Sequence, residues 1–346
     1  MIRVLIVDDS KVSQQLLTGI LNSEPDISVI GTASNGPDAV KLAVTLAPDI
    51  ITMDINMPGM DGFEATRQIM EISPIPIIII SGVDNLSEIA ASFRVMEAGA
   101  LAVLPKPPNP THPNFISACK EIISTIRIYV EVKVIKRRKI AKVTAGTIEP
   151  VIFSPGQIPR LVVIGASTGG PPVIQTILRG LVPSFPLPIV LVQHMSPGFI
   201  NGFAEWLSVS TGFPVKVPQN YEILKPGIMY VAPDAQQTGI TSDFRIALYS
   251  DPPEHNLRPS VSYLFRSVVE NIGPSAIGVL LTGMGNDGAG ELLLMHKKGS
   301  VTIIQDKESS IVYGMPGEAL KLGAASYILT PEDIAQELSL LGGRHN

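Results

Sequence analysis

The sequence lacks the features that mark secreted, membrane-spanning and nucleic-acid-binding proteins. One cysteine among 346 residues excludes an internal disulfide and indicates a reducing compartment. The longest uncharged apolar run, Ile75–Val83, is too short to cross a bilayer. Asp8 and Asp9 interrupt the first apolar stretch, which argues against a signal peptide. The net charge of −5 gives no reason to expect nucleic-acid binding. We therefore expect a cytoplasmic protein without direct membrane insertion.

The composition that remains is that of a folded protein with two domains. Hydrophobic residues make up 45% of the chain and charged residues 16%, which is enough apolar surface for packed cores. The length suits two domains of ordinary size. No internal repeat or low-complexity tract is apparent, so a repeat architecture is not expected.

Residues 1–127 alternate between strand-like and helix-like patterns. The predicted strands, all continuous apolar runs, are 2–7, 28–33, 50–53, 77–80 and 101–104. The predicted helices, which show helical apolar spacing, are 12–21, 37–46, 63–72, 87–98 and 114–128. Five strand–helix units with buried strands predict a parallel sheet that helices cover on both faces.

Residues 128–158 interrupt this alternation and are predicted to be a linker between domains. They hold a basic run, Lys133, Lys136, Arg137, Arg138, Lys139 and Lys142. A nucleic-acid contact is an alternative, but only Tyr129 offers an aromatic side chain next to the charges. The predicted domains are thus 1–127 and 159–346.

The alternation resumes in residues 159–346. The predicted strands are 161–164, 189–192, 228–232, 277–281 and 301–304. The predicted helices are 173–178, 199–207, 261–269, 289–297 and 316–322. The fold class is therefore α/β, with two doubly wound parallel-sheet domains.

Polar side chains follow four predicted strands of the first domain. Asp8 and Asp9 follow the first strand, Asp54 the third, Ser81 the fourth and Lys106 the fifth. A single aspartate at such a place is usually a helix N-cap. Because parallel strands end at one edge of a sheet, however, we expect all five side chains to meet. Three carboxylates suit Mg²⁺, with the lysine and serine left for a phosphoryl group.

These residues resemble the receiver domain of two-component response regulators. The stretches Asn56-Met57-Pro58, Met60-Asp61-Gly62 and Lys106-Pro107 add to the resemblance. It implies that Asp54 accepts a phosphoryl group from a histidine kinase. It also implies that Asp8, Asp9, Asp54 and Asn56 form the Mg²⁺ site, and that Ser81 and Lys106 contact the phosphoryl group. One departure is Val103, where the family often has an aromatic residue.

The second domain contains a serine on a glycine-rich turn. Gly165–Gly170 follows a predicted strand, precedes a predicted helix and fits G-x-S-x-G, the signature of a nucleophile elbow with Ser167 as nucleophile. A dinucleotide-binding loop is the alternative, and it expects an acidic residue after the next strand. That strand ends instead in Gln193-His194-Met195, which disfavours the dinucleotide interpretation.

A histidine and an aspartate follow two further predicted strands of the second domain. His194 would serve Ser167 as a base, and Asp287, which lies between glycines before a helix, would orient His194. Asp287 could also be only an N-cap. The chain order Ser, His, Asp differs from the order Ser, Asp, His of α/β-hydrolases, so that fold is not expected.

These motifs resemble the catalytic domain of the CheB-type chemotaxis protein-glutamate methylesterases. The matching stretches are Gly165–Gly170, Gln193–Met195, Arg258–Val261, Leu281–Ala289 and Tyr313–Pro316. The resemblance implies Ser167 as nucleophile, His194 as general base, Asp287 as orienter and the Met284 backbone N–H as oxyanion donor. It implies that methylated chemoreceptors are the substrates, that glutamate and methanol are the products, that glutamine deamidation is a related activity, and that the esterase step needs no cofactor.

Two departures from this family concern residues outside the triad. Leu257 stands where the family commonly has histidine, and Gln236, Gln237 and Thr238 stand near another usual histidine. An alternative function is a signalling adaptor that binds a partner through a hydrolase-like domain without turnover. The presence of all three triad residues favours the enzyme.

Overall fold

The computed structural model describes residues 1–82, 93–132, 158–182 and 184–343. The chain forms two compact units, Met1–Val151 and Ile152–Asn346. The basic run of the predicted linker lies outside the described residues, so the predicted linker boundaries stay predictions. In the described part of the chain, no helix is long and apolar enough to cross a membrane.

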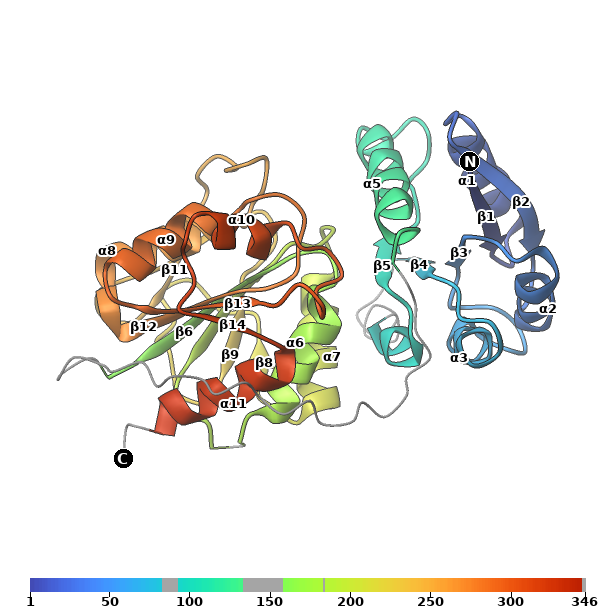
Figure 1. The fold of residues 1–346 in the computed structure, drawn as a ribbon. Helices are drawn as coiled ribbons and strands as arrows, with labels where there is room; N and C mark the ends of the chain where they lie inside the picture. Colours follow the sequence, from blue (N-terminus) through green and yellow to red (C-terminus); the bar gives the residue numbers. More distant parts are fainter. Residues whose placement is uncertain (83–92, 133–157, 183, 344–346) are drawn as a thin grey trace. The chain divides into compact units, whose positions relative to one another are not determined.

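The N-terminal unit is built on a five-stranded parallel sheet (Figure 1). Its strands are β1 (Ile2–Val7), β2 (Ile27–Ala33), β3 (Ile50–Met53), β4 (Ile77–Ser81) and β5 (Ala102–Pro105), in the order β2-β1-β3-β4-β5. Because both faces are covered, the strands are almost wholly apolar; Ile50–Met53, for example, is buried throughout.

Helices cover both faces of this sheet. They are α1 (Lys11–Asn22) and α5 (Phe115–Tyr129) on one face, and α2 (Gly36–Leu46) and α3 (Gly62–Ile72) on the other (Figure 1). Residues 93–98 are also helical, and the start of the predicted helix 87–98 lies outside the described residues. Short polar side chains begin α1, α2 and α3 by accepting a backbone N–H three residues on, as N-caps do: Ser10, Asn35 and Asp61.

The C-terminal unit contains a seven-stranded parallel sheet in the order β14-β13-β12-β6-β7-β9-β8. The strands are β6 (Leu161–Ala166), β7 (Ile189–Gln193), β8 (Val215–Lys216), β9 (Met229–Val231), β12 (Ala276–Leu280), β13 (Val301–Gln305) and β14 (Tyr327–Leu329). The two edge strands, β8 and β14, were not predicted. The parallel α/β class predicted for both domains is confirmed.

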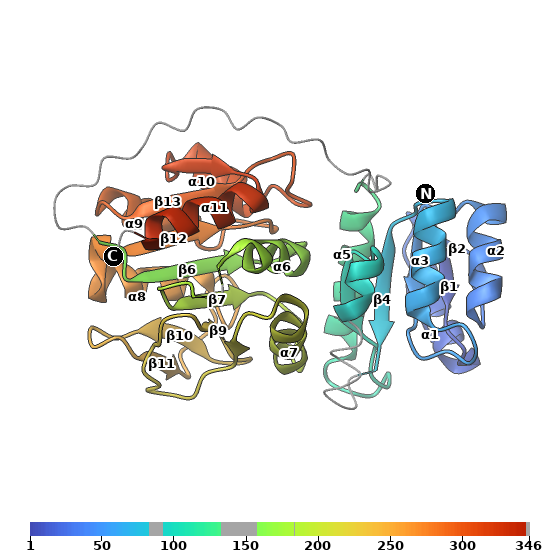
Figure 2. The same ribbon diagram turned by 90° about the horizontal axis from the view of Figure 1, so that it is seen from below.

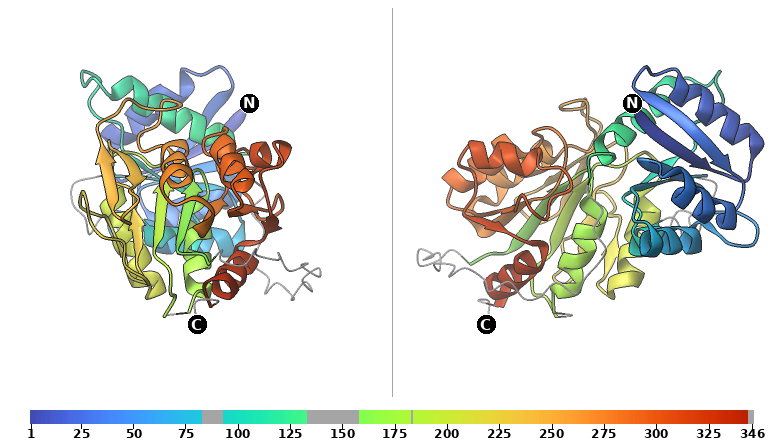
Figure 3. Two further views of the ribbon diagram at one scale, coloured as in Figure 1. Left: turned by 90° about the vertical axis from the view of Figure 1, so that its left-hand side faces the viewer. Right: turned by 45° about the vertical axis from the view of Figure 1, so that its right-hand side comes forward.

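Two layers of helices enclose this second sheet. One layer holds α6 (Gly170–Gly180), α7 (Ile200–Thr211) and α11 (Pro331–Gly342), and the other α8 (Val261–Asn271), α9 (Ala289–Lys297) and α10 (Met315–Lys321). Figure 3 shows the orange helices α8 and α9 of the second layer across the sheet from the green helix α6 and the yellow helix α7 of the first. A short 3₁₀-helix, Gly273–Ser275, leads into β12.

An antiparallel pair lies outside the parallel sheet and was also not predicted. Strands β10 (Gln237–Ile240) and β11 (Ile246–Tyr249) form this pair, and β10 packs against α8 (Figure 2). The pair thus brings a separate segment of chain to the helix that follows residue 260.

The order of the strands determines where a site can form. From β6, the chain crosses to β7 on one side and later returns to place β12 on the other side. Such a reversal leaves a crevice at the carboxyl ends of the strands, where ligands bind in open α/β sheets. Ser167, His194 and the segment Thr282–Asp287 follow β6, β7 and β12, so they share this edge.

Candidate active site

Ser167 lies on a tight turn between β6 and α6. Its backbone N–H donates to the Thr282 carbonyl at 3.0 Å, and its carbonyl accepts from Gly170 N–H at 2.8 Å. Gly169 has φ +82°, and a Cβ there would lie 2.8 Å from Ile311, so the turn requires glycine. The turn holds Ser167 half-buried at the start of α6.

Gln193 joins the backbones of Ser167 and His194. Its Nε2 donates to the Ser167 carbonyl at 2.9 Å and to the His194 carbonyl at 2.8 Å. Its Oε1 lies against Gly170, where an added Cβ would come within 2.1 Å of it. The sequence showed Gln193 only as part of a motif; its contacts show that it positions both neighbours.

His194 and Asp287 form the hydrogen bond that the sequence predicted. His194 Nε2 lies 3.0 Å from Asp287 Oδ2, and the His194 N–H donates to the Ala166 carbonyl at 2.9 Å. Nδ1 is thereby left to accept a proton. Among the described residues the Ser167 hydroxyl makes no hydrogen bond, and catalytic hydrogen bonds of this kind often form only when substrate is bound.

The Asp287 carboxylate lies at the N-terminus of α8. It accepts hydrogen bonds from Val261 N–H at 2.7 Å, Ser262 N–H at 2.9 Å and the Ser260 hydroxyl at 2.9 Å. Burial alone would raise the pKa of Asp287, but the hydrogen bond and charge of His194 and the hydrogen bonds from Ser262 hold it well below the usual range. The helix N-terminus favours a negative charge as well. Asp287 is therefore a fixed anion at neutral pH.

Two glycines allow α8 to approach this closely. A Cβ on Gly165 would lie 2.3 Å from Val261 Cγ1, and a Cβ on Gly288 would lie 2.4 Å from the same atom. Gly288 N–H also donates to the Ser262 hydroxyl at 2.9 Å. Sequence reasoning missed the roles of Ser260 and Ser262, although a serine directly before a helical pattern is an N-cap signal.

The Met284 backbone N–H follows Gly283, which lies against Ser167, and is unpaired among the described residues. The Gly283 carbonyl accepts from Gly314 N–H at 3.0 Å and Met315 N–H at 2.9 Å. Because N–H and C=O point in opposite directions across a trans peptide, the Met284 N–H points away from these two donors. A Cβ on Gly283 would lie 2.7 Å from Ser167 Cβ. A free N–H on the residue after Gly283 suits an oxyanion donor.

The N-terminal unit brings its acidic cluster and lysine together. Lys106 Nζ lies 2.8 Å from Asp8 Oδ2 and 2.8 Å from Asp54 Oδ2. Carboxylate oxygens of Asp8, Asp9 and Asp54 lie within 4.8 Å of one another. Asn56, two residues beyond Asp54, is exposed. The arrangement gives a cation three carboxylate ligands beside a fixed ammonium group.

Two features of this cluster indicate a site for a further charged group. Burial, aided by the charge of Asp8, raises the pKa of Asp54, although Lys106 acts in the opposite direction. The buried Ser81 hydroxyl has no hydrogen-bond partner among the described residues, while the Ser81 carbonyl accepts from Lys106 N–H at 2.9 Å. An orphaned buried hydroxyl beside a lysine fits an incoming anion.

Comparison with known proteins gives a family for each of the two units. The family described as CheB methylesterase matches residues 162–338, and the response regulator receiver domain matches residues 4–113. The chain is 59% identical to protein-glutamate methylesterase/protein-glutamine glutaminase 2 of Methanospirillum hungatei, over 99% of each chain. It is 49% identical to the corresponding protein 4 of Geobacter metallireducens, again over 99% of each.

A solved structure extends the comparison to the fold. The CheB methylesterase catalytic domain of Thermotoga maritima superposes with a TM-score of 0.51 at 35% identity, and the match covers 53% of this chain and 98% of that one.

Proposed function

The chain belongs to the CheB family of protein-glutamate methylesterases, and from that premise we propose that it hydrolyses glutamate methyl esters on chemoreceptors. The products are a glutamate side chain and methanol, and glutamines at such sites are deamidated by the same acyl chemistry. The observation that carries the proposal is the His194–Asp287 hydrogen bond at the sheet edge that also holds Ser167.

Ser167, His194 and Asp287 act as nucleophile, general base and orienting anion. The Ser167 hydroxyl attacks the ester carbonyl and passes its proton to His194, whose charged form Asp287 stabilises. His194 then protonates the departing methoxy group, which leaves an acyl-enzyme. Water attacks the acyl-enzyme while His194 takes its proton, and glutamate and free Ser167 result. In deamidation, ammonia leaves in place of methanol.

The Met284 N–H stabilises the oxyanion that forms twice in this reaction, first when Ser167 attacks the ester and again when water attacks the acyl-enzyme. Its lack of a partner among the described residues supports this role, because the donor then needs no rearrangement before the reaction. One such donor contributes about 3 kcal/mol to transition-state stabilisation. Gln193, through the carbonyls of Ser167 and His194, keeps the two reacting side chains at a fixed separation.

The N-terminal unit regulates this reaction through phosphorylation of Asp54 by a histidine kinase. The clustered carboxylates fit Mg²⁺, so Asp8, Asp9 and Asp54 would hold the ion, with Asn56 as a further ligand. When bound, Mg²⁺ neutralises charge on the phosphoryl group. Lys106 and Ser81 would each bind a phosphoryl oxygen. Without phosphorylation, the receiver restricts access of the protein substrate to Ser167.

The same proposal places the enzyme in the cytoplasm, without bound nucleic acid. The single cysteine supports the cytoplasmic location, and the negative net charge supports the absence of bound nucleic acid.

Replacing the nucleophile tests the central proposal. We expect Ser167→Ala to abolish methanol release from a methylated receptor fragment, because no other group can form the acyl-enzyme. Mass spectrometry of the fragment would show whether any glutamate is demethylated, and thermal unfolding would show whether the variant is folded. Methanol release at the wild-type rate by folded Ser167→Ala would refute the assignment.

A further inference from the structure

Gln237, the first residue of β10, is fully buried and has no part in the mechanism above. Its Oε1 accepts from Ser260 N–H at 2.9 Å. Its Nε2 donates to the carbonyls of Pro252 at 3.2 Å and Leu257 at 3.3 Å. Because the oxygen faces a donor and the nitrogen faces two acceptors, only one orientation of the amide fits.

The two carbonyls belong to a short hairpin ahead of α8. Glu254 and Leu257 exchange backbone hydrogen bonds of 3.0 and 2.7 Å. His255 and Asn256 between them have φ +52° and +63°, which is the backbone of a two-residue type I′ turn. The tip is exposed to solvent. The hairpin is thus a defined element, which we call the 251–257 hairpin.

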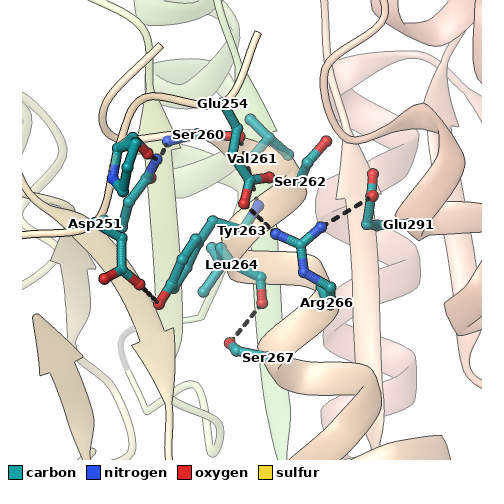
Figure 4. A network of polar contacts seen from close by, with 12 residues as sticks. Asp251, Glu254, Ser260, Val261, Ser262, Tyr263, Leu264, Arg266, Ser267 and Glu291 are labelled. Atoms are coloured by element: carbon teal, nitrogen blue, oxygen red, sulfur yellow. Dashed lines mark hydrogen bonds and ion pairs between the residues drawn. The ribbon is translucent and has the colours of Figure 1, made fainter. Parts of the chain in front are cut away.

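Side chains of α8 hold the 251–257 hairpin in place (Figure 4). The Tyr263 hydroxyl donates to Asp251 Oδ2 at 2.6 Å. Arg266 pairs with Glu254 and also lies 3.6 Å from Glu291 of α9. The hairpin and the first turns of α8 are therefore one packed unit, and Gln237 lies between them.

A continuous set of hydrogen bonds leads from this hairpin to the triad. Gln237 accepts from the Ser260 backbone N–H, and the Ser260 hydroxyl donates to Oδ1 of Asp287. The other carboxylate oxygen of Asp287, Oδ2, contacts His194. On the basis of the proposed esterase function, we propose that Gln237 is a positioning residue. It joins the 251–257 hairpin to Ser260 and thereby sets the Asp287 carboxylate against His194.

The cost of losing Gln237 follows from its burial. An apolar side chain there would leave the N–H of the buried Ser260 without its partner, and an unpaired buried donor is costly. The carbonyls of Pro252 and Leu257 would each lose one hydrogen bond, although Leu257 would still accept from Glu254 N–H. Ser260 would then shift, and its hydroxyl would no longer align with Asp287. Displacement of a catalytic group by about 1 Å lowers turnover by roughly 10²-fold.

Two departures from the family sequence meet at this point. Gln237 is one of three residues near a usual histidine, and Leu257, whose carbonyl it binds, replaces another. An imidazole can also accept through one nitrogen and donate through the other. Histidine is therefore the substitution that should preserve the connection.

The test compares Gln237→Met, of similar length and apolar, with the matched control Gln236→Met. Gln236 is the neighbouring residue and makes no hydrogen bond within the described ranges. We expect Gln237→Met to lower kcat for p-nitrophenyl acetate by roughly 10- to 100-fold with KM unchanged. We expect it also to lose the low-field proton NMR signal of the His194–Asp287 hydrogen bond. Gln236→Met should retain both.

Further variants separate positioning from a general effect on folding. Gln237→His should restore kcat and the low-field signal, and a double-mutant cycle with Ser260→Ala should give a combined loss smaller than the sum. If Gln237→Met does not fold, the same criteria apply to Gln237→Asn, which keeps a buried amide but shortens it. Inactive wild-type enzyme would refute the proposed function itself. An active wild type and a folded Gln237 variant with unchanged kcat and signal would overturn the positioning role.

Discussion

Two buried aspartates, Asp54 in the receiver and Asp287 in the esterase unit, have pKa values that their surroundings shift in opposite directions. Both follow strands at the carboxyl edge of a parallel sheet. Burial and a neighbouring carboxylate raise the pKa of Asp54, although Lys106 opposes them. Burial acts on Asp287 too, but the contacts with His194 and Ser262 lower its pKa.

The two carboxylates also differ in whether their partners belong to the backbone or to a side chain. Besides His194, Asp287 contacts two backbone N–H groups and one hydroxyl at a single helix N-terminus, which cannot move independently. Asp54 accepts from one backbone N–H, that of Ile55, and pairs with the side-chain ammonium of Lys106. A fixed anion suits the orientation of His194, whereas a side-chain partner that can move suits the phosphoacceptor role proposed for Asp54.

The largest effect is expected from removing the fixed anion. Asp287→Asn should lower kcat for ester hydrolysis by about 10⁴-fold, the effect of the same change in serine proteases, because the amide favours the wrong imidazole tautomer. Steady-state methanol release measures it, with near-ultraviolet circular dichroism as the folding control. Turnover close to wild type would show that Asp287 is only a helix cap.

The second largest effect is expected from displacing the Met284 N–H, the proposed oxyanion donor. Gly283→Ala places a methyl group 2.4 Å from Met315 Sδ and 2.7 Å from Ser167 Cβ, so the peptide that carries the Met284 N–H must move. We expect kcat to fall by roughly 10²- to 10³-fold with little change in KM. Gly290→Ala is the matched control, since a Cβ there meets nothing within 4 Å. Equal activity of the two variants would argue against this oxyanion donor.

A smaller effect is expected on the receiver side. Asp54→Asn should remove the increase in esterase rate caused by a small phosphodonor, because the amide cannot form an acyl phosphate. Asp38→Asn, a change at an exposed position in the first turn of α2, should keep that increase. Rates with and without phosphodonor, measured on a methylated receptor fragment, distinguish the two. Full stimulation of Asp54→Asn would exclude Asp54 as the phosphoacceptor.

The smallest effect is on stability in acid. Because the folded pKa of Asp287 lies below its unfolded value, its contribution to stability is complete at neutral pH and is lost as the pH falls from the ordinary carboxyl range, about pH 4, toward the folded pKa. The stability of Asp287→Asn should therefore decline less between about pH 5 and pH 3 than that of the wild type.

Trp206 offers a selective readout of that acid effect. It is the one tryptophan of the chain and is buried on α7, so its fluorescence follows the esterase unit and not the receiver. Parallel declines in the two proteins would contradict the lowered pKa.

The sequence predicted the central strands and the residues that follow them, because a buried parallel strand is a continuous apolar run. It missed β8 and β14, which have two and three residues and lie at the sheet edges. It also missed the antiparallel pair β10 and β11. Although all four residues of β10 are buried, it contains Gln237, Thr238 and Gly239 and is therefore not a continuous apolar run.

The triad residues could be predicted because each follows a strand that ends at the same edge of the sheet. The residues that hold the triad in position could not. Ser260 and Ser262 reach Asp287 only because Val261 packs against Gly165 and Gly288, a contact between segments far apart in the chain. Gln237 likewise depends on where β10 meets α8. Local patterns contain no information on such approaches.

The contacts of Gln237 with the 251–257 hairpin have a consequence for redesign. Gln237 binds the main-chain carbonyls of Pro252 and Leu257, and the side chains that hold the hairpin on α8 are those of Asp251 and Glu254, so neither link uses the side chains of the tip. The exposed tip residues, His255 and Asn256, can therefore be exchanged for others that tolerate the turn. A library of tip sequences would vary this exposed part of the surface while the contacts of Gln237 are kept.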